Sequence, residues 1–281
     1  MNIHIEDEVL FEELKRISVF NIEIGSRMYG TNNEESDRDI LYIYIPSQDE
    51  MNSISSSHHQ YQFKENGIDH IFTDIFTFIK NTLNGDSTIN FEVINSEKIE
   101  HSNLDWLVSY RDYFRNYKIL RAYLGRARKD LKQMKSMSNI KDCTKKVSHG
   151  IRCYQFACDV LENSFQSLWD DKYHYDILAT TRAMTNKRKV YELASEYEMK
   201  ISVLRERVNH LLDSGKLDME QYMSKEAIVK LDLSLSMFVS IARAKQEFKH
   251  GESNYYNNLR YLVASAIADG IDYGDSSIKV K

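Results

Sequence analysis

Two aspartates, Asp37 and Asp39, stand one residue apart at the start of the apolar run ILYIYI. In a strand, residues i and i+2 point to the same side, so we expect both carboxylates to face one point in space. Adjacent carboxylates repel each other unless a cation lies between them, and oxygen ligands of this kind suit Mg²⁺ or Mn²⁺. The spacing therefore predicts a metal site. The alternative is that NNEESD is an ordinary turn, where acids are common.

A Gly-Ser pair, Gly25 and Ser26, closes an earlier apolar run, VFNIEI. Glycine lets the backbone approach a ligand closely, and the serine adds a hydroxyl to the N–H groups of the turn, so this pair could hold a terminal phosphate. Paired acids on one strand beside a strand that ends in Gly-Ser are what a metal–nucleoside triphosphate site requires. Arg27 could bind a phosphate, or it could form an ion pair with Glu34 or Glu35.

The residues that carry this chemistry need a sheet to position them. Strands are expected at 18–24, at 39–45 as a central strand, and at 58–65 and 68–74, which flank Asn66-Gly67, the strongest short hairpin signal. Helices are expected at 6–17 and 74–85, with Thr73 or Asp74 as the cap of the second.

From Asn103 onward the periodicity is helical, with long segments at 104–114, 117–134, 143–161 and 190–212 and a last helix at 254–270. The sequence thus predicts an α+β protein, in which a small mixed-sheet domain at 1–102 is followed by a helical domain at 103–281.

Composition favours a globular protein: 42% of the 281 residues are hydrophobic, 28% are charged, and Pro46 is the one proline. The three cysteines show no CxxC spacing, which favours reduced, buried thiols. No signal peptide and no apolar run of membrane-spanning length is visible, so we expect a cytoplasmic protein with no membrane partner. His58 and His59 are consecutive, point to opposite faces of a strand, and are interpreted as ordinary surface.

The net charge of −5 is unevenly distributed. Residues 111–152 hold thirteen Lys/Arg and three Asp, a local excess of ten positive charges, so the remainder carries −15. Such asymmetry indicates either a phosphate-rich partner or a well-solvated helix face.

At this point the residues resemble a known family. The pattern G-S-R-x-Y-G followed by S-D-x-D is similar to the nucleotidyltransferase superfamily named after DNA polymerase beta, and more narrowly to the RNA-repair-associated, RlaP-type members. A second stretch, with an acid on a strand, a helix and Glu92, also fits, and the resemblance covers roughly residues 18–160. The matching residues of the first stretch are Gly25, Ser26, Arg27, Tyr29, Gly30, Ser36, Asp37 and Asp39.

The resemblance implies a nucleotidyltransferase core with three acids and two magnesium ions, which moves a nucleoside monophosphate from an NTP to an acceptor hydroxyl. It implies Asp69 as the third carboxylate, a ligand of the catalytic metal that helps to deprotonate the hydroxyl. Asp74 is the rival, but capping a helix is a sufficient reason for its presence. The family usually has a Gly-Asn-Pro run where this chain has GDST, at 85–88.

In the helical part, a Lys-rich and His-x-x-Arg helix resembles the family loosely, which adds Lys146, His149 and Arg152 as candidate nucleotide-binding residues, together with Lys145. The alternative for the i, i+3 pair His149 and Arg152 is a buried histidine and an exposed arginine.

The sequence leaves three possible acceptors: an RNA 3′ end, a protein hydroxyl and a small molecule. The family resemblance and the basic stretch favour RNA. A non-catalytic nucleotide- or RNA-binding module is the alternative function.

Overall fold

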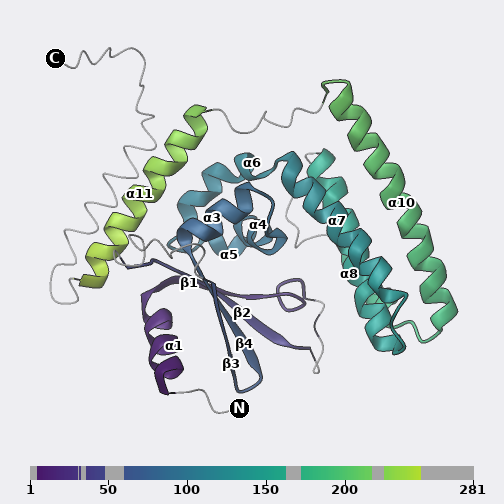
Figure 1. The fold of residues 1–281 in the computed structure, drawn as a ribbon, viewed down its shortest axis with the longest axis horizontal. Coiled ribbons are helices and arrows are strands. Elements are labelled where there is room, and N and C mark those ends of the chain that lie inside the picture. The colour runs from purple at the N-terminus through teal and green to yellow at the C-terminus, as the bar shows by residue number, and fades with distance from the viewer. Residues whose placement is uncertain are drawn as a thin grey trace. The chain divides into compact units, whose positions relative to one another are not determined.

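The computed structural model describes residues 5–30, 32, 36–47, 60–162, 172–216 and 225–247. The chain forms two compact units, residues 1–224 and residues 225–281. The first unit contains the sheet and most of the helices (Figure 1). The second contributes one described helix, α11 (Lys225–Glu247). His58, His59, Glu34, Glu35 and the helix expected at 254–270 lie outside the described residues.

A four-stranded mixed sheet forms the N-terminal part, with the order β1-β2-β4-β3. β2 lies in the interior, as its apolar pattern predicted, antiparallel to β1 and parallel to β4, and β3 and β4 form the hairpin at Asn66-Gly67. Both turn residues have positive φ, 50° and 79°, as such a tight turn requires. The strands are β1 (Ser18–Ile24), β2 (Arg38–Tyr44), β3 (Gln60–Glu65) and β4 (Ile68–Asp74).

Helix α1 (Ile5–Ile17) covers one face of the sheet (Figure 1). Phe11 and Leu14 of α1 form a buried cluster with Tyr44 of β2 and Phe72 of β4. Because side chains alternate along a strand, Asp39, Leu41 and their partners in β4 point to the opposite face. The acids therefore lie on the side of the sheet away from α1.

Short helices follow the sheet. Asp74 is the N-cap of α3, and its side chain accepts a hydrogen bond of 2.8 Å from the backbone N–H of Thr77. Ser87 caps α4 in the same way. The elements are α3 (Ile75–Leu83), α4 (Thr88–Ile94), α5 (Glu97–Glu100), the 3₁₀ helix η1 (Asp105–Tyr110) and α6 (Arg111–Phe114).

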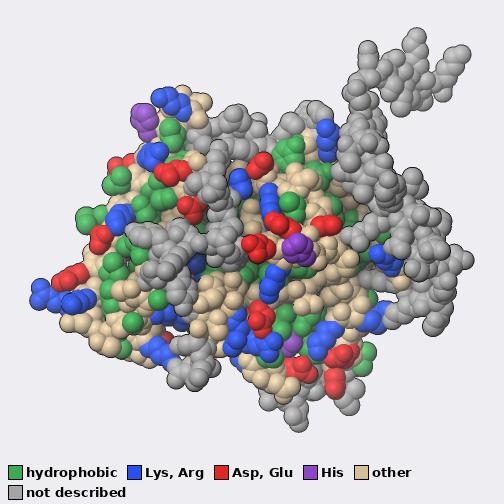
Figure 2. Space-filling model, turned by 180° about the vertical axis from the view of Figure 1, so that it is seen from behind, with side chains coloured by type: hydrophobic (Ala, Val, Ile, Leu, Met, Phe, Trp, Pro, Cys, Tyr) green, Lys and Arg blue, Asp and Glu red, His purple; other side chains and the backbone are tan. Residues whose placement is uncertain are grey.

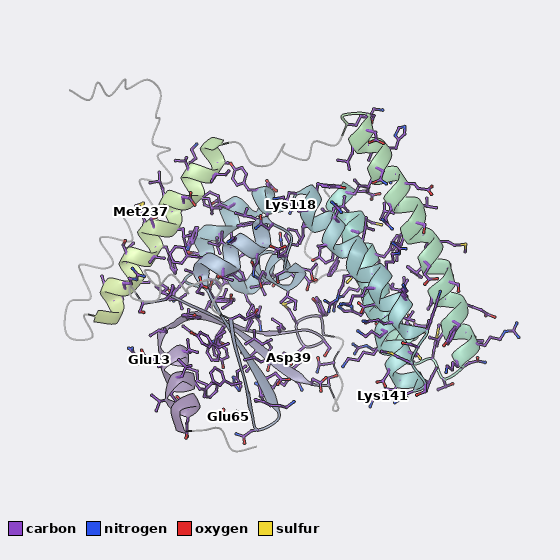
Figure 3. All side chains as sticks on the ribbon, viewed as in Figure 1. Glu13, Asp39, Glu65, Lys118, Lys141 and Met237 are labelled. Carbon is purple, nitrogen blue, oxygen red and sulfur yellow. The ribbon has the colours of Figure 1, made fainter. Side chains whose placement is uncertain are left out.

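Long helices complete the first unit. α7 and α8 run antiparallel, with Lys118 and Lys141 near their respective starts and at opposite ends of the pair (Figure 3). They approach closely at Gly150, where a Cβ atom would lie 3.0 Å from Leu131 and 3.2 Å from the carbonyl oxygen of Ala127. α9 packs against α8, and α10 packs against both α7 and α8. Their bounds are α7 (Tyr117–Met134), α8 (Ile140–Glu162), α9 (Lys172–Arg182) and α10 (Lys187–Asp213).

The α+β class predicted from the sequence is confirmed, with the sheet first and the helices after it. The division into domains at 102/103 stays a prediction. Cys143, Cys153 and Cys158 form no disulfide, and the first two are buried and the third half-buried. Within the described residues, no helix is long and apolar enough to cross a membrane.

Candidate active site

Gly25 and Asp39 are neighbours at one edge of the sheet. β1 pairs with β2 so that Ile24 stands opposite Asp39, and the next residue, Gly25, begins a turn with φ of 69°. A Cβ atom on Gly25 would lie 3.6 Å from Oδ2 of Asp39. The N–H of Met28 donates to the carbonyl oxygen of Gly25 at 3.1 Å and closes the turn. The Gly-Ser turn and the acids therefore meet at one place, as the sequence spacing predicted.

The parallel pairing of β2 and β4 brings the third carboxylate to the same place. Asp39 stands directly opposite Asp69, and Asp37 lies just before β2. Burial raises the pKa of Asp39, and the negative charges of Asp69 and Asp37 raise it further, against the opposing effect of Lys145 and Lys64. Asp74, the rival of Asp69, lies at the other end of β4 as the cap of α3.

Two lysines contact the acids. Nζ of Lys145, on α8, lies 3.2 Å from Oδ2 of Asp37, and Nζ of Lys64, on β3, lies 3.6 Å from Oδ2 of Asp69. Lys64 lies beside the acids because β3 pairs with β4 so that Lys64 stands opposite Asp69, and it is far from Lys145 in the sequence. The negative charge at the sheet edge is thus partly balanced by cations of the chain itself.

The three carboxylates have the oxygen chemistry that Mg²⁺ or Mn²⁺ prefers, and the mutual repulsion felt by Asp39 is relieved by a divalent cation. In the part of the chain that the structure describes, however, no three His, Cys, Asp or Glu side chains are already arranged to hold a metal. Asp37 and Asp69 instead each contact a lysine. Both pairs involve strongly exposed lysines, so they are weak, at about 0–1 kcal/mol each, and can give way.

Behind the site, Asp130 of α7 is almost fully buried, with 1% of its side chain exposed. It accepts from Nδ1 of His149 and, at 3.0 Å, from Nζ of Lys146, and Nε of Arg126 lies at 3.6 Å. Burial alone would raise the pKa of Asp130, but the hydrogen bonds from His149 and Lys146 outweigh it and lower that pKa. Burial lowers the pKa of His149 despite this carboxylate. Lys146 and His149 therefore tie α8 to α7.

A second buried carboxylate, Glu92 of α4, joins four segments of the chain. It accepts from the hydroxyl of Tyr29, in the turn after β1, and at 3.1 Å from that of Tyr123, on α7. The guanidinium of Arg152, on α8, stacks 3.6 Å from the centre of the Tyr29 ring. Burial raises the pKa of Glu92 to about 7, although Arg152 and the Tyr123 hydroxyl act against this. The Gly-Ser turn is thus anchored to the helices.

One face of α8 turns toward the sheet edge. Lys145, His149 and Arg152 follow each other at i, i+4 and i+7, which places them on one side of the helix. Lys145 reaches Asp37 and Arg152 reaches Tyr29, so this face spans the acids and the turn. Nε atoms of Arg27 and Arg152 are buried and have no hydrogen-bond partner among the described residues. Asp39 itself is labelled on the sheet in Figure 3.

The structure brings together four of the residues proposed from the sequence: Gly25, Asp37, Asp39 and Asp69. A fifth, Arg152, reaches the turn after β1 by stacking on the ring of Tyr29. Lys146 and His149 instead contact Asp130. Sequence reasoning missed three residues of this region, Lys64, Tyr123 and Asp130. The signal for Asp130 was present, since it is the one acid on the basic helix α7.

A small mixed sheet that presents a glycine turn and carboxylates at one edge, with helices following, is the arrangement expected of a polymerase beta-type nucleotidyltransferase. The profile of RlaP, the RNA repair pathway DNA polymerase beta family, matches residues 3–237, well beyond the 18–160 that the motifs cover. The chain belongs to this family, whose type indicates nucleotidyl transfer. Among curated proteins, none matches the chain.

Proposed function

We propose that the protein transfers a nucleoside monophosphate from an NTP to an acceptor hydroxyl in a reaction that depends on Mg²⁺ or Mn²⁺, with an RNA 3′ end as the acceptor. The observation that carries this proposal is the register of β1, β2 and β4, which places Asp39 beside both Gly25 and Asp69. The family description, with its RNA repair pathway, supports RNA over a protein or small-molecule acceptor.

Asp37, Asp39 and Asp69 are assigned to the divalent cation, which when bound neutralises charge on the phosphates and polarises them. The backbone N–H groups of the turn at Gly25 and the hydroxyl of Ser26 hold the triphosphate. Arg27, whose buried Nε lacks a partner among the described residues, adds a positive charge beside this turn. Arg152, held on the Tyr29 ring, adds another.

In the reaction, the acceptor hydroxyl oxygen forms a bond to the α-phosphorus, and the bond from that phosphorus to the oxygen bridging to the β-phosphate breaks. Pyrophosphate leaves with the bonding electron pair. Asp69 accepts the hydroxyl proton as the general base. Lys145 is assigned to the triphosphate, because it can exchange its contact with Asp37 for a phosphate oxygen. Lys146 and His149, which contact Asp130, hold the same helix against α7.

The test is incubation with each NTP labelled at the α-phosphate, Mg²⁺, and a panel of acceptors: RNA with a free 3′ hydroxyl, RNA with a blocked 3′ end, and proteins. Label should enter only the free-ended RNA, and EDTA should prevent it. Label on protein, or on blocked RNA, would move the acceptor elsewhere. Label on none of the acceptors with any NTP would overturn the catalytic proposal.

Asp69→Asn and Asp74→Asn form a matched pair, because both lie on β4 and both lose one charge. Asp69→Asn should abolish transfer and leave the thermal stability near that of the parent. Asp74→Asn keeps a capping oxygen on α3, since asparagine caps a helix about as well as aspartate, so it should retain both transfer and near-parent stability. The reverse pattern would give Asp74 the catalytic role.

A further inference from the structure

Two separate sets of side chains stand out in the basic stretch at residues 111–152. Lys145, Lys146 and Arg126 contact acids at or behind the candidate active site. The second set lines a groove of about 670 Å³ between α7 and α10. Its cations are Arg121, Arg128, Lys129 and Lys132 of α7 and Arg205 of α10.

The residues of α7 that line the groove and those that lie behind the candidate active site are on opposite sides of the helix. At ~100° per residue, Arg121, Arg128 and Lys132 cluster on one side of the helix, and Arg126 and Asp130 lie about half a turn away. The division follows from helix geometry, since the first three residues are related by i+7 and i+4 steps. A ligand in the groove therefore lies apart from the acids.

The charge of the groove is of one sign. Its five basic side chains are exposed, and no Asp or Glu lines it among the described residues. None of the five forms an ion pair with another described residue, although the net charge of the whole protein is −5. Elsewhere the signs mix: Figure 2 shows Lys/Arg and Asp/Glu side chains interspersed on one face. A row of exposed cations that no acid among the described residues neutralises attracts a polyanion.

The shape of the groove suits a strand. Leu124 and Val208, 4% and 2% exposed, form an apolar floor. At Gly125, a Cβ atom would meet nothing within 4 Å in the described structure, so the groove is open there. Arg121 and Lys132 are eleven positions apart, ~16 Å along the helix axis. A single phosphate or mononucleotide uses only part of such a row, while a sugar–phosphate backbone can meet several of its cations.

We propose that the groove between α7 and α10 binds the sugar–phosphate backbone of an RNA strand and holds the body of the acceptor while its 3′ end lies at the acids. The identity of the strand as RNA rests on the proposed function. The polar lining of the groove is dominated by its five cations, with one amide, Asn209, and one aromatic ring, Tyr117, so contacts to phosphates should outweigh contacts to bases and binding should depend little on sequence.

Salt dependence gives the expected magnitude. With one phosphate at each of the five cations, log affinity falls against log salt with a slope of about −3.5, or about 100-fold between 50 and 200 mM salt. The double variant Arg128→Gln, Lys132→Gln should lose about 20-fold over the same range. The control Lys189→Gln, Lys216→Gln removes two exposed cations outside the groove, one in the first turn of α10 and one just after the helix ends, and should keep the parent slope.

Gly125 offers a test that separates binding from folding. Gly125→Ala and Gly125→Glu both replace a helical glycine by a better helix former, so both should fold at least as well as the parent. Alanine leaves the groove open, whereas glutamate places a carboxylate among the cations. Fluorescence anisotropy with a labelled single-stranded RNA should show parent-like affinity for Gly125→Ala and a loss of tenfold or more for Gly125→Glu.

Equal RNA affinity in Gly125→Glu and Gly125→Ala, or an unchanged slope in the groove double variant, would overturn the proposal. So would equally tight binding of a polyglutamate peptide of matched charge, because the groove would then be a site for acidic protein. These measurements need no turnover: RNA binding without transfer would contradict only the proposed function, and transfer to RNA with unaffected groove variants would contradict only the groove.

Discussion

Lys145 of α8 contacts Asp37, the acid that precedes β2, with 3.2 Å between Nζ and Oδ2. The two residues are 108 positions apart, and both side chains are more than half exposed. The contact joins the helical part of the chain to the acidic edge of the sheet. It also places a lysine ammonium where a divalent cation is proposed to bind, so the two cations compete for the same carboxylate.

Lys145→Met should raise the affinity for Mn²⁺ in the absence of nucleotide, because the competing ammonium is removed. It should lower the affinity for the NTP, because a phosphate contact is lost. The free energy of unfolding should change by less than about 1 kcal/mol, as for other exposed pairs. Calorimetric titrations measure both affinities. Lys141→Met, exposed on the same helix, is the control. Unchanged Mn²⁺ affinity in Lys145→Met would show that Lys145 does not compete with the metal for Asp37.

Asp39→Asn should abolish NTP turnover without destabilising the protein. Asp39 is partly buried and lies beside the charges of Asp69 and Asp37, so its ionised form is unfavourable in the folded chain. Removing that charge should leave the melting temperature equal or higher, a pattern expected where stability is sacrificed for function. Pyrophosphate release and differential scanning calorimetry measure the two effects. Asp213→Asn, exposed at the end of α10, should change neither. Turnover within twofold of the parent would remove Asp39 from the site.

Ser26→Ala should weaken NTP binding and leave RNA binding unchanged, because the hydroxyl is assigned to the triphosphate. A lost hydrogen bond to a charged group costs about 1.5–3 kcal/mol, or about tenfold to a hundredfold in affinity. Calorimetry with the NTP gives the first value, and anisotropy with RNA serves as the internal control. Equal nucleotide affinity for variant and parent would assign the hydroxyl another role.

Local patterns predicted the sheet well. Alternation and the Asn66-Gly67 turn are short-range signals, and the two strands they join have the expected bounds within two residues. Local patterns also predicted that Gly25 follows β1 and that Asp39 lies at the start of β2, and the pairing of the two strands then brings them together.

Contacts between distant segments could not be predicted in this way. Asp130 stands out in the sequence as a single acid among cations, but its burial could not be predicted, because burial depends on how α7 and α8 pack. For the same reason, the basic stretch could not be divided into its two sets. Arg205 joins the groove from α10, more than fifty residues after the stretch ends.

Gly85→Ala should destabilise the protein much more than Gly67→Ala. Both glycines have positive φ, 69° and 79°, so alanine costs about 1–2 kcal/mol of strain at each. At Gly85 the new Cβ would also lie 2.6 Å from the carbonyl carbon of Lys118, at the start of α7, whereas at Gly67 it meets nothing within 4 Å in the described structure. The clash should add about 1–3 kcal/mol. Urea unfolding measures both, and equal losses would show that the GDST loop approaches α7 less closely.

The buried carboxylate of Glu92 should make stability depend on pH. Burial raises its pKa from 4.5 to about 7 in the folded protein. Between these values the folded state keeps a proton that the unfolded chain has lost, so stability falls as pH rises. The contribution is fully present below about pH 4.5 and is lost as pH passes through about 7, with a total of about 3 kcal/mol.

Glu92→Gln removes this titration, so the difference in unfolding free energy between parent and variant should shift against the parent by up to about 3 kcal/mol from pH 4.5 to pH 8. Tyr123→Phe, which removes a hydrogen bond that lowers the pKa of Glu92, should move the upper end of the window to higher pH. Glu206→Gln, exposed on α10, is the control for a lost charge. Urea unfolding at a series of pH values from about 4.5 to about 8 resolves the window. A difference between parent and Glu92→Gln that stays constant with pH would mean that Glu92 is ionised throughout, held as a carboxylate by Arg152 and the two tyrosine hydroxyls.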